Sequence, residues 1–175
     1  YIVGCHELEL MKGIDAVTFA PDNSMTRGMM VTVLARMAQA DLTDYEKDSA
    51  FQDVSKEQWF CSAINWAYEK GITIGISETE FGPDLKMTRE QMATFIDRYF
   101  DVMGLELPKF KEPQTFGDSS AIGDWAKESV DAVQQAGIVE GYPNGNFGPG
   151  NALTRAEAAT MMFRCYGEVK VTIEG

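Results

Sequence analysis

The fold of this chain is decided by the stretch Phe147-Gly-Pro-Gly-Asn-Ala-Leu-Thr-Arg155, because the sequence contains it in three versions. The other two are Phe19-Ala-Pro-Asp-Asn-Ser-Met-Thr-Arg27 and Phe81-Gly-Pro-Asp-Leu-Lys-Met-Thr-Arg89. Each begins Phe-x-Pro and ends on Met or Leu followed by Thr-Arg, and the Thr-Arg pairs recur at spacings of 62 and 66 residues. Self-similarity at such a period is the signature of a repeat architecture. The sequence therefore predicts three tandem copies of one module.

Further landmarks lie upstream of each copy. A Gly-Ile pair occurs at Gly13-Ile14, Gly71-Ile72 and Gly137-Ile138, and an aromatic residue stands twelve positions before each of these glycines: Tyr1, Trp59 and Trp125. The second and third copies open on Phe-x-Asp, namely Phe51-Gln-Asp53 and Phe116-Gly-Asp118. In this register the first copy starts late, and its loop between Gly13 and Phe19 is shorter than the corresponding loops.

Each module is predicted to be two helices joined by a loop. In the second copy Trp59, Ala63 and Ala67 follow the i, i+4 stripe of an amphipathic helix. Gly71 then stands where a left-handed residue ends a helix. The Phe-x-Pro stretch is rich in turn-forming residues, and its Phe is expected to fill the core. The threonine of each Thr-Arg pair is expected to cap the second helix.

The second helices differ in how they begin. Thr154-Arg-Ala-Glu157 is a complete capping box, and Thr88-Arg-Glu-Gln91 keeps its amide version. Thr26-Arg-Gly-Met29 has lost the box and places Gly28 in the first helical turn, which weakens that helix start by up to about 1 kcal/mol. The first copy is therefore expected to be the most divergent.

These patterns indicate an all-α fold of three helix-loop-helix repeats. A pair of helices cannot bury its apolar faces alone, so the three copies are expected to pack on one another. The expected boundaries are 1–45, 46–110 and 111–167, with a tail at 168–175. Val169, Val171 and Ile173 alternate in this tail, which is consistent with a short strand or with the exit to a neighbouring domain.

Composition excludes several classes of protein. The 175 residues are 45% apolar, which is enough for a buried core, and carry a net charge of −12, which disfavours binding to nucleic acid or anionic membranes. No run of 18 apolar residues predicts a membrane span. The cysteines Cys5, Cys61 and Cys165 are widely spaced and are interpreted as buried free thiols. No recurring carboxylate pair, triad or metal cluster predicts an enzyme, a metal site or a cofactor. The chain is expected to be part of a longer, secreted protein.

Three arginines form the candidate binding site. Arg27, Arg89 and Arg155 occupy the first position of a helix, where the helix dipole favours acidic side chains. A helix N-terminus attracts anions, and a guanidinium beside it adds a planar fork suited to a carboxylate. In the alternative reading, each arginine pairs with a carboxylate of a neighbouring copy, such as Asp53 or Asp118, and holds the modules together. The residues alone leave both readings open.

Other recurring residues allow two or more roles. Trp59 and Trp125 could serve as platforms for stacking sugars, but their position on the apolar stripe favours the core. Asp53 and Asp118 precede the first helix and could cap it, contact a ligand hydroxyl or pair with an arginine. A packing or surface role is expected for the arginines that recur nine positions after the Thr-Arg arginines: Arg36, Arg98 and Arg164.

The order of the motifs resembles that of the S-layer homology (SLH) domain. The motifs are, in sequence, Phe-x-Asp-Val, Trp, Gly-Ile, Gly-Tyr-Pro-Asn-Gly-Asn-Phe-x-Pro and Thr-Arg-Ala-Glu. The resemblance covers about residues 1–167. It implies a three-lobed helical bundle with pseudo-threefold arrangement. It also implies binding of secondary cell-wall polymers, often pyruvylated, in grooves between the lobes, with the Thr-Arg arginine contacting the acidic sugar. This role is carried over to Arg27, Arg89 and Arg155.

The resemblance thus predicts a module that anchors a larger protein non-covalently to an acidic cell-wall polysaccharide on the bacterial surface. The candidate glycan-binding residues are Arg89, Arg155, Arg27, Asp53, Asp118, Trp59 and Trp125. Because the first copy departs most from the motif, the groove that uses Arg27 is expected to bind weakly. The alternative is a structural or self-assembly array of a surface protein that binds no glycan.

Overall fold

The computed structural model describes residues 1–15 and 17–174, with side chains as far as Gly167. Within this part of the chain all regular structure is helical, and the only β-type pairings are isolated bridges. The prediction of an all-α fold is confirmed. No helix among the described residues combines the length and the apolar character needed to cross a membrane.

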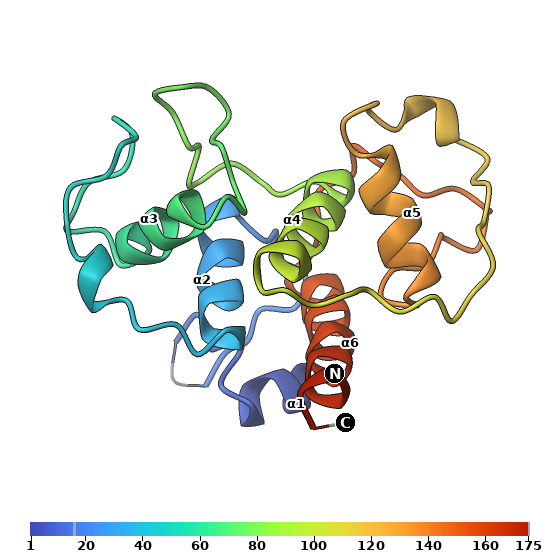
Figure 1. Ribbon diagram of the computed structural model, residues 1–175, viewed down its shortest axis with the longest axis horizontal. Coiled ribbons are helices and arrows are strands. Elements are labelled where there is room, and N and C mark those ends of the chain that lie inside the picture. The colour runs from blue at the N-terminus through green and yellow to red at the C-terminus, as the bar shows by residue number, and fades with distance from the viewer. Residues whose placement is uncertain (16, 175) are drawn as a thin grey trace.

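Each repeat contributes two helices. They are α1 (Ile2–Glu7) and α2 (Arg27–Met37), α3 (Cys61–Glu69) and α4 (Arg89–Val102), and α5 (Lys127–Gln135) and α6 (Arg155–Glu174), with short 3-10 turns η1 (Thr43–Tyr45) and η2 (Ser119–Ala121). In Figure 1, α2, α4 and α6 lie centrally, with α3 and α5 on the outside. Because α6 continues to Glu174, the strand considered for 168–175 is wrong; Gly175 lies outside the described residues.

The repeats interlock in a cycle. The first helix of each repeat packs on the second helix of the repeat before it: α3 lies against α2, and α5 lies against α4. The cycle is completed by α1, which packs on α6 of the last repeat and lies beside it in Figure 1. Each helix pair therefore buries its apolar face with the help of a neighbour, and the three repeats form one core.

The centre of the molecule is a triangle of backbone hydrogen bonds. The N–H of Met25 donates to the carbonyl of Leu153, that of Met87 to Met25, and that of Leu153 to Met87, each at 2.8 Å. These three residues directly precede the Thr-Arg pairs and are completely buried. The recurring apolar residue before each Thr-Arg pair is thus explained by the axis of a pseudo-threefold arrangement.

The helix ends follow the local signals of the sequence. Thr88 and Gln91 form a reciprocal capping box at the start of α4, and Thr154 and Glu157 do the same at α6. Thr26 caps α2 through the N–H of Met29 alone, at 3.3 Å. Gly71 and Gly137 follow the ends of α3 and α5 with φ of +83° and +73°, which is the left-handed conformation expected of them.

Candidate functional site

The three Thr-Arg arginines link the repeats to one another. The Nε of Arg27 donates to the carbonyl of Phe81 at 2.9 Å, and the Nε of Arg89 donates to Phe147 at 2.7 Å. The Nε of Arg155 closes the cycle by donating to Phe19 at 2.9 Å. All three arginines are buried, with exposed fractions of 3–5%. Each guanidinium is therefore held against the Phe-x-Pro loop of the next repeat, at an inter-repeat boundary.

The predicted helix-terminal anion site is not available as such. The N–H groups of Arg27 and Gly28, the first two in α2, donate to the carbonyls of Leu85 and Pro83 in the next repeat. The same pairing occurs at the starts of α4 and α6, and the third N–H is capped by the threonine hydroxyl. Since these donors already have partners, any anion at this corner would depend on the guanidinium itself.

Asp53 and Asp118 hold the Phe-x-Pro loops. The carboxylate of Asp118 accepts the N–H groups of Phe147 and Gly148 at 2.7 and 2.8 Å, and Asp53 does the same for the corresponding pair in the second repeat. Neither aspartate caps the first helix of its repeat, because Phe60 and Ala126 hold those positions, and neither carboxylate lies within 4 Å of an arginine nitrogen among the described residues, so both of these expected roles are wrong. Contact with a ligand hydroxyl remains a prediction.

Electrostatics nevertheless couple these aspartates to the arginines. Desolvation works to raise the pKa of Asp118, but the N–H groups of Phe147 and Gly148 and the charge of Arg89 outweigh it, so the pKa lies below its ordinary value. The loop residue Phe147 joins the two groups, because its N–H donates to Asp118 and its carbonyl accepts from Arg89. The aspartate thereby fixes the carbonyl that positions the guanidinium.

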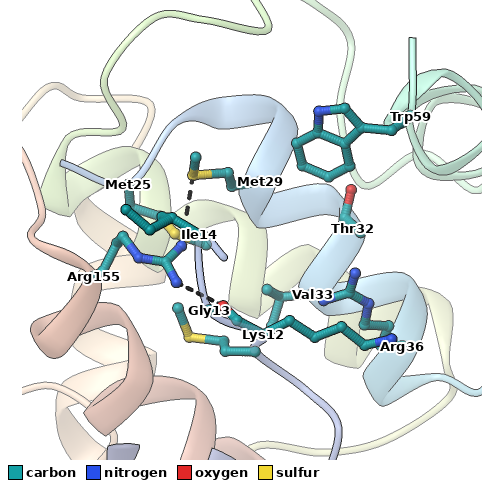
Figure 2. Close-up of a pocket in the computed structure, with 11 residues that line it drawn as sticks. Lys12, Gly13, Ile14, Met25, Met29, Thr32, Val33, Arg36, Trp59 and Arg155 are labelled. Atoms are coloured by element: carbon teal, nitrogen blue, oxygen red, sulfur yellow. Dashed lines mark hydrogen bonds between the residues drawn. The ribbon is translucent and has the colours of Figure 1, made fainter. Parts of the chain in front are cut away.

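One groove lies beside Arg155, and we name it the Arg155 groove (Figure 2). It has a volume of about 440 Å³ and draws on all three repeats: Lys12, Gly13 and Ile14 of the first loop, Met29 and Arg36 of α2, Trp59 and Arg155. Figure 2 shows Arg155 and Trp59 at opposite ends, with α2 side chains between them. None of its described lining residues is Asp or Glu.

A second groove, the Arg27 groove, repeats this construction one module further along the chain. Its volume is about 360 Å³, and its lining includes Arg27, Ile74, Gly75, Gln91, Arg98 and Trp125. An arginine from one repeat, a loop and second helix from the next, and a tryptophan from the one after meet in both grooves. The described lining of the Arg27 groove likewise contains no acidic side chain.

The tryptophans belong to the surface, so the core role favoured for them is wrong. Trp59 and Trp125 are 63% and 56% exposed. The reason is that α3 begins at Cys61 and α5 at Lys127, so both indoles precede the helix and do not lie on its buried stripe. Their exposed rings line the two grooves, as a stacking platform requires.

The first repeat is less divergent than its sequence indicates. Glu9, with φ of +56°, occupies the left-handed position held by Gly71 and Gly137. Gly13 therefore corresponds to Gly75 and Gly141, each six residues before its loop phenylalanine, and the first loop is not shortened. Matching hydrogen bonds confirm this register: Ile14 N–H to Thr18, Ile76 N–H to Glu80 and Tyr142 N–H to Asn146, each at 2.8 Å.

This register also changes the place of Tyr1. Counting from Glu9, Tyr1 corresponds to Ala63 and Ser129, and the position equivalent to Trp59 precedes the first residue of the sequence. Gly28, expected to loosen the start of α2, is buried beside the Phe60 ring, and its N–H is held by Pro83 at 2.9 Å. Of the grounds for a weak Arg27 groove, the shortened loop and the loosening effect of Gly28 are absent, while the missing capping box remains; the weakness of this groove stays a prediction.

The third arginine has the carboxylate of Glu157 close by, and we call its surroundings, with Tyr142 and Glu140, the Arg89 corner. The guanidinium of Arg89 lies over the ring of Tyr142, 4.5 Å from its centroid, and its Nη1 is 3.8 Å from Oε1 of Glu157. Glu140 pairs nearby with Arg164 at 3.7 Å and with Lys111 at 2.7 Å. The carboxylates of Glu157 and Glu140 offset the positive charge of this corner, whereas the described linings of the other two grooves contain no carboxylate.

Sequence reasoning missed two groups of groove residues. Arg36 and Arg98 line the two grooves, and their recurrence nine positions after a Thr-Arg arginine was a usable signal. Lys12 and Ile74, which directly precede the groove glycines, were hidden by the wrong alignment of the first loop.

Comparison with known proteins agrees with this architecture. The family model described as "S-layer homology domain" matches residues 3–29, 50–93 and 115–159, one segment in each repeat. An endoglucanase of Bacillus sp. (strain KSM-635) is 33% identical over 93% of this chain, and the match covers 17% of that protein. The cellulosome-anchoring protein of Acetivibrio thermocellus is 27% identical over 88% of the chain, covering 34% of that protein. The S-layer protein sap of Bacillus anthracis is 30% identical over 82% of the chain, covering 16% of that protein.

The chain thus spans only a minor part of each of these relatives. What they share with it is the three-repeat region, whereas their names describe different whole proteins. The family matches cover more than half of the chain and include the triangle residues, the Phe-x-Pro loops and the three Thr-Arg arginines. The chain belongs to the S-layer homology domain family and consists of three tandem repeats of that domain.

Proposed function

We propose that this chain anchors a larger protein non-covalently to the bacterial cell surface by binding an acidic, pyruvylated cell-wall polysaccharide in its inter-repeat grooves. The module binds and does not catalyse, and other domains of the same protein carry its further activities. The names of two relatives, an S-layer protein and a cellulosome-anchoring protein, support a role at the cell surface.

The observation that carries the proposal is the composition of the two grooves. Each combines a buried Thr-Arg arginine, a second arginine on the adjoining helix and an exposed tryptophan, without an acidic residue in its described lining. In a chain with a net charge of −12, such cationic pockets are local exceptions. Guanidinium groups suit a carboxylate, and an indole face suits the apolar face of a sugar ring.

The cationic lining of the grooves supports an acidic substituent on the bound sugar. A pyruvate ketal adds a carboxylate to a sugar, and this carboxylate could accept hydrogen bonds from the arginines while the ring rests on the tryptophan. The grooves have volumes of about 440 and 360 Å³, which suit a few sugar units of a longer polymer better than a compact protein partner.

The proposal is tested by calorimetric titration with purified wall polysaccharide before and after removal of its ketals. We expect Arg98→Gln to weaken binding by about tenfold, because it removes a groove cation for which no structural hydrogen bond is described. Lys109→Gln is the matched control, since it removes the same charge from an exposed connector. Equal binding by both variants, or indifference to the ketals, would contradict the proposal.

A structural array without glycan binding is the second candidate. It is favoured by the hydrogen bonds of Arg89 and Arg155, whose Nε and Nη2 atoms all donate to backbone carbonyls of another repeat. Substituting these arginines would therefore lower stability as well as any affinity. For this reason Arg98 and the tryptophans, rather than Arg155, separate the two candidates.

A further inference from the structure

The turn that carries Trp125 is fastened to the neighbouring repeat. This turn, Gly123–Ala126, leads into α5 and is closed by the N–H of Ala126, which donates to the carbonyl of Gly123 at 2.8 Å. The N–H of Gly123 donates at 3.0 Å to the carboxylate of Glu90, which lies on α4, the helix on which α5 packs. Both backbone polar groups of Gly123 are therefore held, and one of them is held from another repeat.

The indole of Trp125 packs directly on Gly123. A Cβ atom added to this glycine would lie 2.4 Å from Nε1 of the indole and 3.0 Å from its Cδ1, which is closer than non-bonded atoms approach. The φ of Gly123 lies outside the left-handed region, so any residue could adopt its backbone conformation. The site therefore uses this glycine for the space that its missing side chain leaves to the indole.

In the Arg155 groove the equivalent space is filled from the opposite side. Gly28 stands there at the position of Glu90. Phe60 stands at the position of Ala126, and its buried ring approaches Gly28 so closely that a Cβ there would lie 3.1 Å from it. The same ring contacts Trp59 edge-on, with centroids 5.0 Å apart. Each groove thus has one large residue beside its tryptophan, contributed by α4 in one case and by the turn before α3 in the other.

From these contacts, and resting on the proposed function, we infer that Glu90 is a positioning residue of the Arg27 groove. It holds the turn at Gly123, so that the indole of Trp125 is already oriented as a platform when a sugar ring arrives. An indole that is 56% exposed must otherwise be ordered during binding, and that ordering subtracts from affinity. Glu90 is not part of the described lining of the groove, so it acts through the backbone of the turn.

A pair of glycine variants tests the placement of the indole. Gly123→Ala adds a methyl group where the ring lies, so the exposed ring must swing away. Gly150→Ala is the matched control, since its new methyl group meets open space and its φ is likewise not left-handed. In calorimetric titrations with purified, ketal-bearing wall polysaccharide, we expect Gly123→Ala to bind about fivefold more weakly than Gly150→Ala.

A second pair of variants tests Glu90 itself. Glu90→Ala and Glu90→Gln remove the same charge, but only glutamine keeps an oxygen that can accept the N–H of Gly123. We therefore expect Glu90→Ala to bind the polysaccharide about fivefold more weakly than Glu90→Gln. Chemical denaturation of the same samples shows that both variants are folded.

Fluorescence of Trp125 reports its order without any ligand. In a Trp59→Phe background the chain keeps two of its three tryptophans, and Trp66 is only 3% exposed, so Trp125 is the exposed emitter. Time-resolved anisotropy should show faster local rotation of this indole with Glu90→Ala than with Glu90→Gln. If the unmodified chain binds no polysaccharide, the proposed function fails and the platform role fails with it. If it binds, but the two Glu90 variants agree in affinity or in anisotropy, only the positioning role is overturned.

Discussion

Replacing the groove tryptophans tests whether the surface placement of these residues serves binding. Trp59→Ala and Trp125→Ala should lower affinity for the polysaccharide without destabilising the fold, because the two indoles are 63% and 56% exposed. The three tryptophans of the chain include a matched control, Trp66, which lies on α3 and is only 3% exposed.

The expected magnitude follows from the exposed area. A tryptophan side chain offers up to about 250 Å². With about 60% exposed, a sugar ring that covers one face removes about 75 Å² from water. At about 25 cal/mol per Å² this contributes about 2 kcal/mol, which corresponds to roughly 30-fold in Kd. Truncating the buried Trp66 should instead cost about 3–5 kcal/mol of unfolding free energy.

The assay pairs calorimetric titration with chemical denaturation of the same samples. The groove variants should lose affinity and keep their unfolding midpoints, whereas Trp66→Ala should lose much of its stability. A Trp59→Ala, Trp125→Ala double variant that binds as tightly as the unmodified chain would refute the stacking role. Destabilisation equal to that of Trp66→Ala would refute the surface placement.

Three further predictions concern stability and reactivity. Asp118→Asn should lower the unfolding free energy by about 1–2 kcal/mol near pH 7. In the folded protein the pKa of Asp118 lies below its ordinary value, so the carboxylate stabilises the fold above about pH 4, and this stabilisation is lost as pH falls through the folded pKa. The difference in unfolding free energy between the unmodified chain and Asp118→Asn should therefore shrink at low pH in urea titrations. A difference that stays constant contradicts this. Glu9→Gly should raise stability by about 0.5–1 kcal/mol in the same assay, because glycine adopts φ of +56° without strain, and a loss would argue against this placement. Desolvation raises the pKa of the buried Cys5 thiol to about 11, so mass spectrometry should find it unalkylated at about pH 8 until urea unfolds the chain, and rapid alkylation of folded protein would contradict its burial.

The sequence predicted those parts of the fold that depend on short-range chemistry. The Thr88 and Thr154 caps, the helix starts at Arg89 and Arg155, and the left-handed Gly71 each follow from residues a few positions apart. Such signals can be read directly from the sequence because a cap or a C-terminal glycine acts within one helical turn.

The errors arose where one residue replaced another without changing the backbone. Glu9 adopts the conformation usually given to glycine, so aligning Gly13 with Gly71 displaced the whole first loop by four positions. Trp59 stands immediately before the residue that caps α3, so the helical stripe was extended too far toward the N-terminus. Both errors concern the ends of elements, where periodicity is weakest as a guide.

The candidate site required three-dimensional information. That Arg27 meets Phe81, Ile74 and Trp125 depends on three repeats converging, and no spacing within one repeat reveals it. The difference between the Arg27 groove and the Arg89 corner lies in two carboxylates and in the buried Nη2 of Arg27, which has no hydrogen-bond partner among the described residues. The repeated Thr-Arg motif identified the three arginines as candidate binding residues. It could not show which of their guanidinium groups donate all their hydrogen bonds within the chain.

The central backbone triangle also determines how many modules this domain can contain. An open stack of repeats gains or loses a unit at little cost, since each unit touches only its neighbours, and such a stack can fray from its ends. Here the N–H of Met25 donates to Leu153 of the last repeat, and α1 packs on α6 of that repeat. A two-module version would leave a donor and a helix face open, and a fourth module has no vacant place in the triangle. The domain is therefore expected to unfold in one all-or-none transition, and a ribosome-bound chain cannot complete its core before α6 has been synthesised.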